Sequence, residues 1–164
     1  MNMRPRGFTL IELLIVIGII GIIAAAVLVA VDPAKRFAQS RDARRSAEVY
    51  SILNAVLNYA ADHVGALPSA IDGDSSTAQI LGTAASGCNV GCSPAGTTTV
   101  ACADLHGDLV DTYIAKMPID PRGTNGSVTY DSLRTGYYIN RTANGRITIG
   151  SCNPELVSDI SAQR

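Results

Sequence analysis

The sequence has few of the residues on which catalysis usually depends. It contains only two histidines, His63 and His106, and they are far apart in the chain. No nucleophile motif and no glycine-rich phosphate loop accompanies them, so we expect neither an enzyme nor a cofactor. The formal net charge is −1, which predicts no general affinity for nucleic acid and argues against nucleic acid as a partner.

Charged side chains are almost absent from one long segment near the N-terminus. Residues 8–31 form an apolar run of 24 residues in which Thr9 and Glu12 are the only polar side chains, with no lysine or arginine. About 20 such residues suffice for a helix to cross the hydrocarbon core of a bilayer. The rest of the chain is rich in alanine, glycine, serine and threonine and can bury only a modest core. The composition therefore predicts a small domain on a membrane helix.

The apolar run also lacks the features of a cleaved secretory signal peptide. It is longer than a typical signal-peptide core, and no small-residue cleavage site of the A-x-A kind follows it. Glu12 is equally unexpected in a simple membrane anchor, because a charge inside a bilayer costs roughly 2.5–3.5 kcal/mol on insertion scales. Since the run offers no basic side chain, we expect the partner of Glu12 to come from elsewhere.

The segment "GFTLIELL" at residues 7–14 resembles the processing site of type IV pilins and of the related pseudopilins. In these families a short basic leader ends in glycine, and Phe-Thr-Leu-Ile-Glu then opens a long apolar helix. The basic residues of the leader are here Arg4 and Arg6. The resemblance implies that a prepilin peptidase removes residues 1–7 as a leader peptide and methylates the new amino group of Phe8.

The same resemblance gives Glu12 a function in assembly. It implies that the Glu12 carboxylate faces the cationic N-terminus of a neighbouring subunit, on Phe8, as a filament forms. Each of these charges is costly to desolvate alone, and breaking such a pair leaves the other charge uncompensated. A pairing of this kind would favour one axial register between subunits.

Residues 32–63 are expected to extend the helix as an amphipathic half. Apolar residues recur there at three- and four-residue spacing and predict one buried face, made of Val49, Ile52, Leu53, Val56 and Ala60. The other side carries charged residues that we expect to be solvated, namely Arg41, Arg44, Arg45 and Glu48. The resemblance extends to this segment, which is similar to the second half of a pilin helix.

Pro33 interrupts the predicted helix. It cannot donate a hydrogen bond to the carbonyl of Val29, and its ring crowds that turn, so we expect a kink or a break. Asp32 would then cap the restarted helix, with Pro33 at its first position.

Residues 64–164 are expected to form a small C-terminal domain, so that the fold class is α+β and pilin-like, with a long helix packed on a short antiparallel sheet. Residues 68–100 have little periodicity and predict a long loop with one short helix at residues 76–81. Apolar spacing predicts a helix over residues 103–117, which the prolines at 118 and 121 end. The strings "SVTYD", "GYYIN" and "RITIG" alternate as strands do.

The last two predicted strands allow a choice of register. A two-residue turn at Asn144-Gly145 would leave both isoleucines of the second strand opposite polar residues. A three-residue loop over residues 143–145 instead pairs Ile139 with Ile149 and places Gly145 at the left-handed position that such loops favour. Because the apolar pattern sets register, we predict the three-residue loop.

The four cysteines all lie in the second half of the chain. The spacing of Cys88, Cys92 and Cys102, with His106, offers four zinc ligands. However, the first spacing is not C-x2-C, Cys152 is left over, and an exported domain meets oxidising conditions, so we favour disulfides and no metal. Of the three possible connectivities we choose Cys102 with Cys152 and Cys88 with Cys92. A calcium site using Asp120 or Asp131, as in some pseudopilins, is a weaker alternative.

The function predicted from the resemblance is a structural subunit of a type IV pilus. The partners would be further copies of the chain in a helical filament, the prepilin peptidase, the assembly machinery of the inner membrane and, before assembly, the membrane itself. The precursor would be a single-pass inner-membrane protein and the product an extracellular filament. Two alternatives are a pseudopilin of a type II secretion system and a zinc- or ligand-binding domain on a membrane anchor. One observation opposes the expected topology: more basic residues follow the apolar run than precede it.

Overall fold

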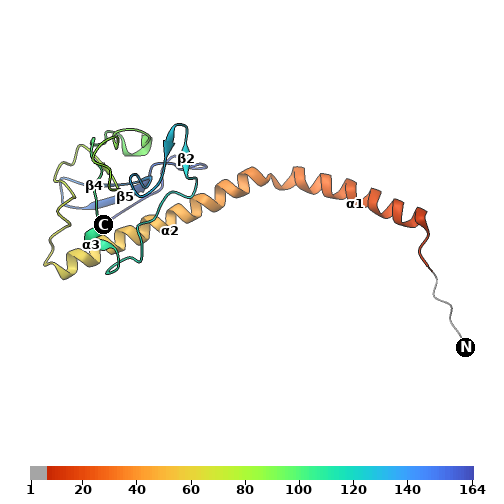
Figure 1. Ribbon diagram of the computed structural model, residues 1–164, viewed down its shortest axis with the longest axis horizontal. Helices are drawn as coiled ribbons and strands as arrows, with labels where there is room; N and C mark the ends of the chain where they lie inside the picture. Colours follow the sequence, from red (N-terminus) through yellow and green to blue (C-terminus); the bar gives the residue numbers. More distant parts are fainter. Residues whose placement is uncertain (1–6) are drawn as a thin grey trace, which may run out of the picture. The chain divides into compact units, whose positions relative to one another are not determined.

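The computed structural model describes residues 7–164 (Figure 1). The predicted leader, including Arg4 and Arg6, therefore lies outside the described residues except for Gly7. The chain divides into two compact units: the first ends at Phe37 and the second is Ala38–Arg164.

The first unit contains helix α1, Leu10–Val31. Its 22 residues span about 33 Å at 1.5 Å per residue, and the helix is long and apolar enough to cross a membrane. None of its residues is buried. An apolar helix without an apolar partner is costly in water, so α1 requires a bilayer or other protein chains around it.

Asp32 separates α1 from helix α2, Pro33–Asp62. Its backbone is left-handed, with φ 44° and ψ 80°, and its carboxylate Oδ1 accepts a hydrogen bond from the Lys35 N–H at 3.3 Å. Pro33 is tolerated as the first residue of α2 because a helix leaves that N–H unpaired in any case. The local sequence thus ends one helix and starts the next within a single residue.

The apolar face of α2 forms the core of the second unit. Val49, Ile52, Leu53 and Val56 are almost completely buried, as their spacing predicts, whereas Ala60 is only partly buried. They pack with residues of the sheet and of the loops, among them Leu105, Leu109, Tyr137, Ile139 and Ile149. Burial of these side chains is the main stabilising contribution to the unit.

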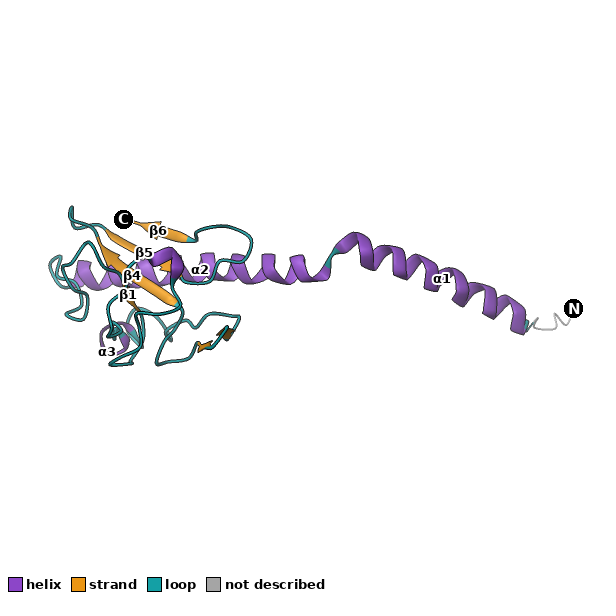
Figure 2. Ribbon diagram, turned by 90° about the horizontal axis from the view of Figure 1, so that it is seen from above, coloured by secondary structure: helices purple, strands orange, loops and turns teal. Residues whose placement is uncertain are grey.

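The sheet of the second unit has four antiparallel strands in the order β1-β4-β5-β6 (Figure 2). These strands are β1 Gln79–Ile80, β4 Tyr137–Arg141, β5 Ile147–Ser151 and β6 Ser161–Gln163. Outside the sheet lie a two-stranded ribbon, β2 Thr124–Asn125 with β3 Val128–Thr129, the 3-10 turn η1 Ser93–Ala95 and helix α3 His106–Leu109. An α+β layout with a short antiparallel sheet is therefore present.

The predicted hairpin register between β4 and β5 is confirmed. Ile139 lies opposite Ile149 and Arg141 opposite Ile147. Gly145 has a positive φ of 78° in the connecting loop and donates its N–H to the carbonyl of Thr142 at 2.8 Å. Ile139, Ile147 and Ile149 therefore all face the core, as the alternation of apolar residues along the strands requires.

Two predicted helices are wrong in extent or kind. Residues 76–81 contain strand β1 instead of a helix, because Leu81 donates its N–H to the carbonyl of Tyr137. The helix predicted over residues 103–117 shrinks to the four residues of α3. Asp111 has a positive φ of 68°, and the chain after it turns so that Tyr113 and Ile114 pack on the core. Tertiary pairing overrides local helical spacing in both places.

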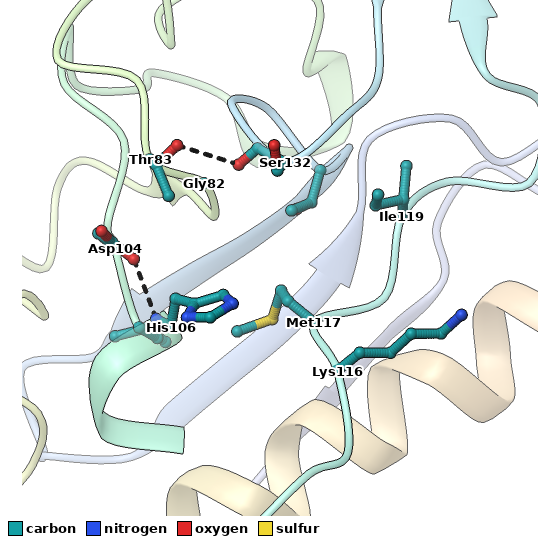
Figure 3. Close-up of a pocket in the computed structure, with 10 residues that line it drawn as sticks. Gly82, Thr83, Asp104, His106, Lys116, Met117, Ile119 and Ser132 are labelled. Carbon is teal, nitrogen blue, oxygen red and sulfur yellow. Dashed lines mark hydrogen bonds between the residues drawn. The ribbon is translucent and has the colours of Figure 1, made fainter. Parts of the chain in front are cut away.

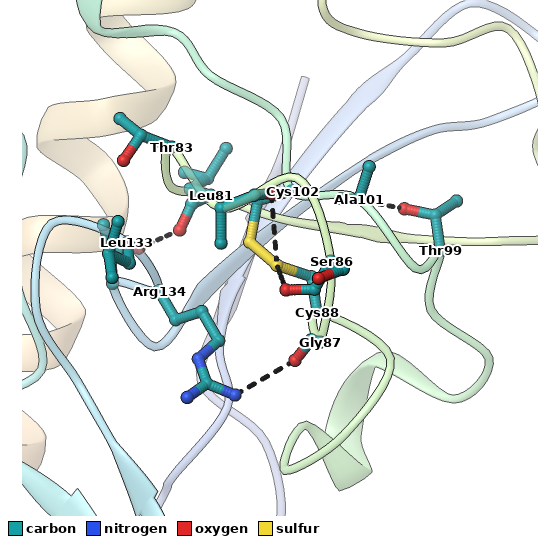
Figure 4. The surroundings of a disulfide bond; sticks show 12 residues. Leu81, Thr83, Ser86, Gly87, Cys88, Thr99, Ala101, Cys102, Leu133 and Arg134 are labelled. Carbon is teal, nitrogen blue, oxygen red and sulfur yellow. Dashed lines mark hydrogen bonds between the residues drawn. A yellow bond between two sulfur atoms is a disulfide. The ribbon is translucent and has the colours of Figure 1, made fainter.

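Both pairs of the predicted disulfide connectivity are wrong, although disulfides are present. The bonds join Cys88 to Cys102 and Cys92 to Cys152. The first pair follows from a loop pairing shown in Figure 4, in which the Cys102 N–H donates to the carbonyl of Ala84 at 3.0 Å. The Cys88 N–H likewise donates to the carbonyl of Val100 at 2.9 Å. Cys102 is therefore held beside Cys88, and Cys92 is left to meet Cys152 at the end of β5.

The charged side of α2 is not a simple solvated face as predicted. The Arg45 side chain is completely buried and forms a two-point ion pair with Asp120, at 2.8 Å from Nε and 2.9 Å from Nη2. Its Nη1 donates to Asp42 and to Glu155 at 2.8 and 2.7 Å. Arg41 also binds Glu155 through two hydrogen bonds. We name these five residues the arginine cluster.

The arginine cluster fastens two distant loops to α2. Asp42 accepts hydrogen bonds from the backbone N–H groups of Glu155 and Leu156. The loop after β5 is therefore bound to α2 through its backbone by Asp42 and through the Glu155 side chain by Arg41 and Arg45. The hydrogen bonds from Arg41, and then those from Arg45, outweigh burial and lower the pKa of Glu155 to about 2. Glu155 is therefore ionised at neutral pH, as the cluster needs.

Candidate functional site

The junction between Gly7 and Phe8 is open to another protein. Gly7 is exposed, and 90% of the Phe8 surface is accessible. A Cβ placed on Gly7 would meet nothing within 4 Å, so the fold of the described chain does not itself require glycine there. A requirement for glycine at this position would come from a partner that binds the junction.

Thr9 and Glu12 form a capping box at the start of α1. The Thr9 Oγ1 accepts the backbone N–H of Glu12 at 3.3 Å. The Glu12 carboxylate in turn accepts the Thr9 N–H at 2.9 Å and the Thr9 hydroxyl at 2.7 Å. These bonds satisfy backbone donors that a helix otherwise leaves unpaired at its first turn. They also fix where the carboxylate lies before any second chain approaches.

Thr9 is thus a hydrogen-bond partner of Glu12, which the expectation of a basic partner did not include. The pattern Thr-x-x-Glu at the start of an apolar run is itself the signal of a capping box and was readable from residues 9–12. The bonds to Thr9 leave the charge of Glu12 uncompensated. Among residues 7–164, no cation lies within ion-pair distance of Glu12. The Glu12 carboxylate therefore accepts hydrogen bonds from Thr9 but has no positive counter-charge within the described residues.

A pocket lies in the C-terminal unit beside α3 (Figure 3). It has a volume of about 210 Å³, and its walls include His106, Lys116, Met117 and Ile119. One of its polar side chains is already engaged by the backbone: Asp104 Oδ1 accepts a hydrogen bond from the N–H of His106 at 2.9 Å. The hollow is mostly apolar, and its hydroxyl side chains include those of Thr83 and Ser132. The Thr83 hydroxyl donates to the carbonyl of Ser132 at 3.4 Å.

The residues weighed as metal ligands have other partners. Cys88, Cys92 and Cys102 are consumed in disulfides and cannot bind zinc as thiolates. Both oxygens of Asp120 accept hydrogen bonds from Arg45, and Asp131 Oδ1 accepts the backbone N–H of Leu133 at 2.8 Å. Within the described range no three potential ligands gather to hold a metal ion.

Comparison with known families points to the same N-terminal segment. Residues 2–28 match the family model described as the prokaryotic N-terminal methylation motif. The chain carries the type IV prepilin signal. No match was found among curated proteins or among solved structures.

The methylation motif supports a type IV pilin-like or pseudopilin protein, and the α+β layout of the chain fits the pilin-like fold. The motif implies processing by a prepilin peptidase and subsequent assembly, and proteins that carry it are structural rather than catalytic. Helix α1, the one helix in residues 7–164 that is long and apolar enough to cross a membrane, fits an inner-membrane precursor. The matched residues cover Gly7, Phe8, Thr9 and Glu12 and most of α1.

Proposed function

We propose that this pilin-like protein is a structural subunit of a type IV pilus. Prepilin peptidase hydrolyses the peptide bond between Gly7 and Phe8, which leaves a carboxylate on Gly7 and an amine on Phe8. A methyl group from a methyl donor then replaces one hydrogen of that amine. The methylated α-amine is mostly protonated at neutral pH, because an α-amino group has an ordinary pKa of about 7.7–8.0, so it can act as the counter-charge for Glu12.

The observation that supports polymerisation through α1 is the combination of apolar surface and one carboxylate on a helix with no buried residue. In the membrane, lipid covers the apolar surface but supplies no counter-charge to Glu12. In a bundle of α1 helices, neighbours cover the same surface, and the Phe8 amine of one subunit meets Glu12 of another. Transfer from membrane to filament therefore conserves apolar contact and gains an ion pair.

The second unit supports display outside the cell. Its core is independent of α1, and it is reinforced by two disulfides and by the arginine cluster. Disulfides persist in oxidising compartments. A domain reinforced in this way is suited to an exposed surface of a filament.

The test is electron microscopy of material sheared from cells that express the native gene, with the protein identified in the filaments by mass spectrometry. Long surface filaments that contain it are the expected result. Cells that hold the processed protein only in the periplasm and inner membrane, and that lose type II secretion when the gene is deleted, would instead make it a pseudopilin. Recovery of unprocessed protein alone would contradict both assignments.

A further inference from the structure

One side of the C-terminal unit carries a group of carboxylates around α3, which we name the acidic flank. Its members are Asp62, Asp104, Asp108 and Asp111. The Tyr113 hydroxyl donates to Asp62 at 2.9 Å and so joins the end of α2 to this segment. Among the described residues none of the four carboxylates forms an ion pair. Lys116, nearby in the chain, offsets only one of these charges.

A second group, the basic flank, contains three exposed arginines at the hairpin end of the sheet, namely Arg141, Arg146 and Arg164. Arg141 lies opposite Ile147 on β4. Arg164 exchanges two backbone hydrogen bonds with Ile147 from the other side, at 2.7 and 3.0 Å. The described part of the chain offers no ion pair to these guanidinium groups either. Asp159 is the nearest acidic residue in sequence to Arg164 and offsets one charge.

Arg164 of the basic flank and the segment that leads into the acidic flank lie at opposite edges of the sheet, whereas Arg141 lies at the end of β4 and Arg146 in the loop after it. Ala103, which leads into α3, is hydrogen-bonded to the outer edge of β1 through the carbonyl of Ile80 at 2.8 Å. Arg164 follows β6, the strand at the far edge. Figure 2 shows α3 and the C-terminus on opposite sides of α2. Three strand spacings of about 4.8 Å place the edge strands β1 and β6 roughly 14 Å apart, which exceeds the screening length of about 8 Å at physiological ionic strength.

We propose that the basic flank of one copy of this chain docks against the acidic flank of the next. This inference rests on the proposed function and deepens it, because it names a contact between subunits beyond α1. A contact between two different patches on identical chains is heterologous, and a heterologous contact that does not close into a ring generates an open helical filament. Complementary charge on the two sides of one domain supplies such a contact with a defined direction.

The geometry explains why these charges are unpaired within the chain. Pairing them internally would add little, because exposed ion pairs are screened and contribute little to folding. In a filament the same pairs are partly shielded from water and repeat at every subunit. They would also exclude the reverse arrangement, in which like charges face each other.

Two reversals and their combination test the contact. Arg146→Glu with Arg164→Glu makes the basic flank net negative, because only Arg141 remains. Asp62→Lys with Asp108→Lys makes the acidic flank, counted with Lys116, net positive. Each double variant is expected to lower the yield of sheared filament about tenfold. The chain with all four changes has flanks of opposite sign again and is expected to recover to within about twofold of the wild type.

Matched controls keep the charge and change the shape. Arg146→Lys with Arg164→Lys, and Asp108→Glu, should assemble as the wild type does. Both disulfides should be intact in membrane-bound subunit of every variant, which shows that the domain has folded. A fourfold variant that assembles no better than the double variants would overturn the proposal, as would double variants with wild-type yield.

The same chains distinguish this proposal from the proposed function. If the wild type forms no surface filament, the pilus assignment fails, and the flanks are then tested on purified full chain in detergent by sedimentation velocity. Self-association that weakens with salt, is lost in both double variants and returns in the fourfold variant supports the contact. Self-association that changes neither with salt concentration nor with any of the four substitutions would overturn the proposal, as would the absence of self-association.

Discussion

At the scale of single residues, Glu12 and Asp120 are carboxylates that the chain uses in opposite ways. Asp120 is buried and satisfied within the chain, with both oxygens bound to Arg45. Glu12 is exposed on α1, and among the described residues its carboxylate receives hydrogen bonds from Thr9 alone. A carboxylate without a counter-charge in an apolar segment is destabilising unless a partner arrives. Asp120 therefore stabilises the subunit, whereas Glu12 is placed to stabilise a contact between subunits.

We predict that Glu12→Ala inserts into the membrane normally but does not join filaments. Removing the charge makes the apolar run easier to insert, and the core of the second unit does not involve α1. Filament entry should fail because the Phe8 amine would be buried without its counter-charge. Glu12→Gln should be nearly as poor. The measurement is the ratio of sheared filament to membrane-bound subunit in cells that make only the variant.

Thr9→Val is the control for the capping box, since it removes the Thr9 side-chain bonds and keeps the carboxylate. We expect it to assemble far better than Glu12→Ala. Wild-type filament yield from both Glu12 variants, or equal failure of Thr9→Val, would show that the charge of Glu12 is not what assembly requires.

Asp120→Asn should destabilise the second unit by about 3 kcal/mol, because Arg45 would remain buried with less negative charge around it. Urea unfolding of the full chain in detergent, followed by tyrosine fluorescence, measures the change; the chain has six tyrosines and no tryptophan. Asp159→Asn removes an exposed carboxylate and should stay within about 0.5 kcal/mol of the wild type. Equal effects of the two substitutions would contradict a structural function for the arginine cluster.

Glu155 makes stability depend on pH in the acid range. Its pKa is lowered from an ordinary 4.5 to about 2 by the hydrogen bonds from Arg41 and Arg45. Because the folded value lies below the unfolded one, this contribution is complete above pH 4.5 and is lost as pH falls toward 2. Unfolding free energies at pH 7, 4 and 2 should therefore decline less steeply in Glu155→Gln than in the wild type. Parallel declines would refute the assignment.

At the scale of elements, the sequence predicted the helix face and the strand register that follow from periodic apolar spacing. It did not predict the features that depend on residues far apart in the chain. The apolar face of α2 and the β4–β5 register follow from periodic spacing and were correct. Strand β1 has two residues and exists because β4 lies beside it, so no local pattern marks it. Arg45 can be buried because it pairs with Asp120 and Glu155, which lie 75 and 110 positions further along the sequence. The capping box of the candidate site, by contrast, is formed by residues three positions apart and can be predicted from the Thr-x-x-Glu pattern alone.

The two disulfides should differ in their effect on stability. Cys92–Cys152 closes a loop with a sequence separation of 60, and Cys88–Cys102 one of 14. Loop-closure entropy predicts a contribution of about 4 kcal/mol for the longer loop and about 3 kcal/mol for the shorter. Replacing both cysteines of the longer loop by serine should therefore lower the urea midpoint more than the same change in the shorter loop. Peptide mapping without reduction checks the pairing, and a Cys102–Cys152 peptide would contradict it.

At the scale of the whole molecule, the chain joins two units that are stable in different surroundings, one apolar and one aqueous. The first contains α1, an apolar helix with one carboxylate, which requires a membrane or other copies of α1. The second has its own core, two disulfides and charge on two flanks, and suits water. Cleavage after Gly7 would affect only the first unit, yet it creates the amine on which the proposed assembly depends.

The last prediction concerns this cleavage. We expect the native protein in filaments to begin at N-methyl-Phe8, so that its intact mass lacks residues 1–7, gains one methyl group and lacks four hydrogens because of the two disulfides. Gly7→Val should leave the precursor uncut in the membrane, since a branched side chain would adjoin the cut bond in the peptidase. The described fold has open space at Gly7, so the substituted chain should still fold and form both disulfides. Filaments that contain Met1 or Asn2, or normal maturation of Gly7→Val, would show that the prepilin signal is not used in this chain.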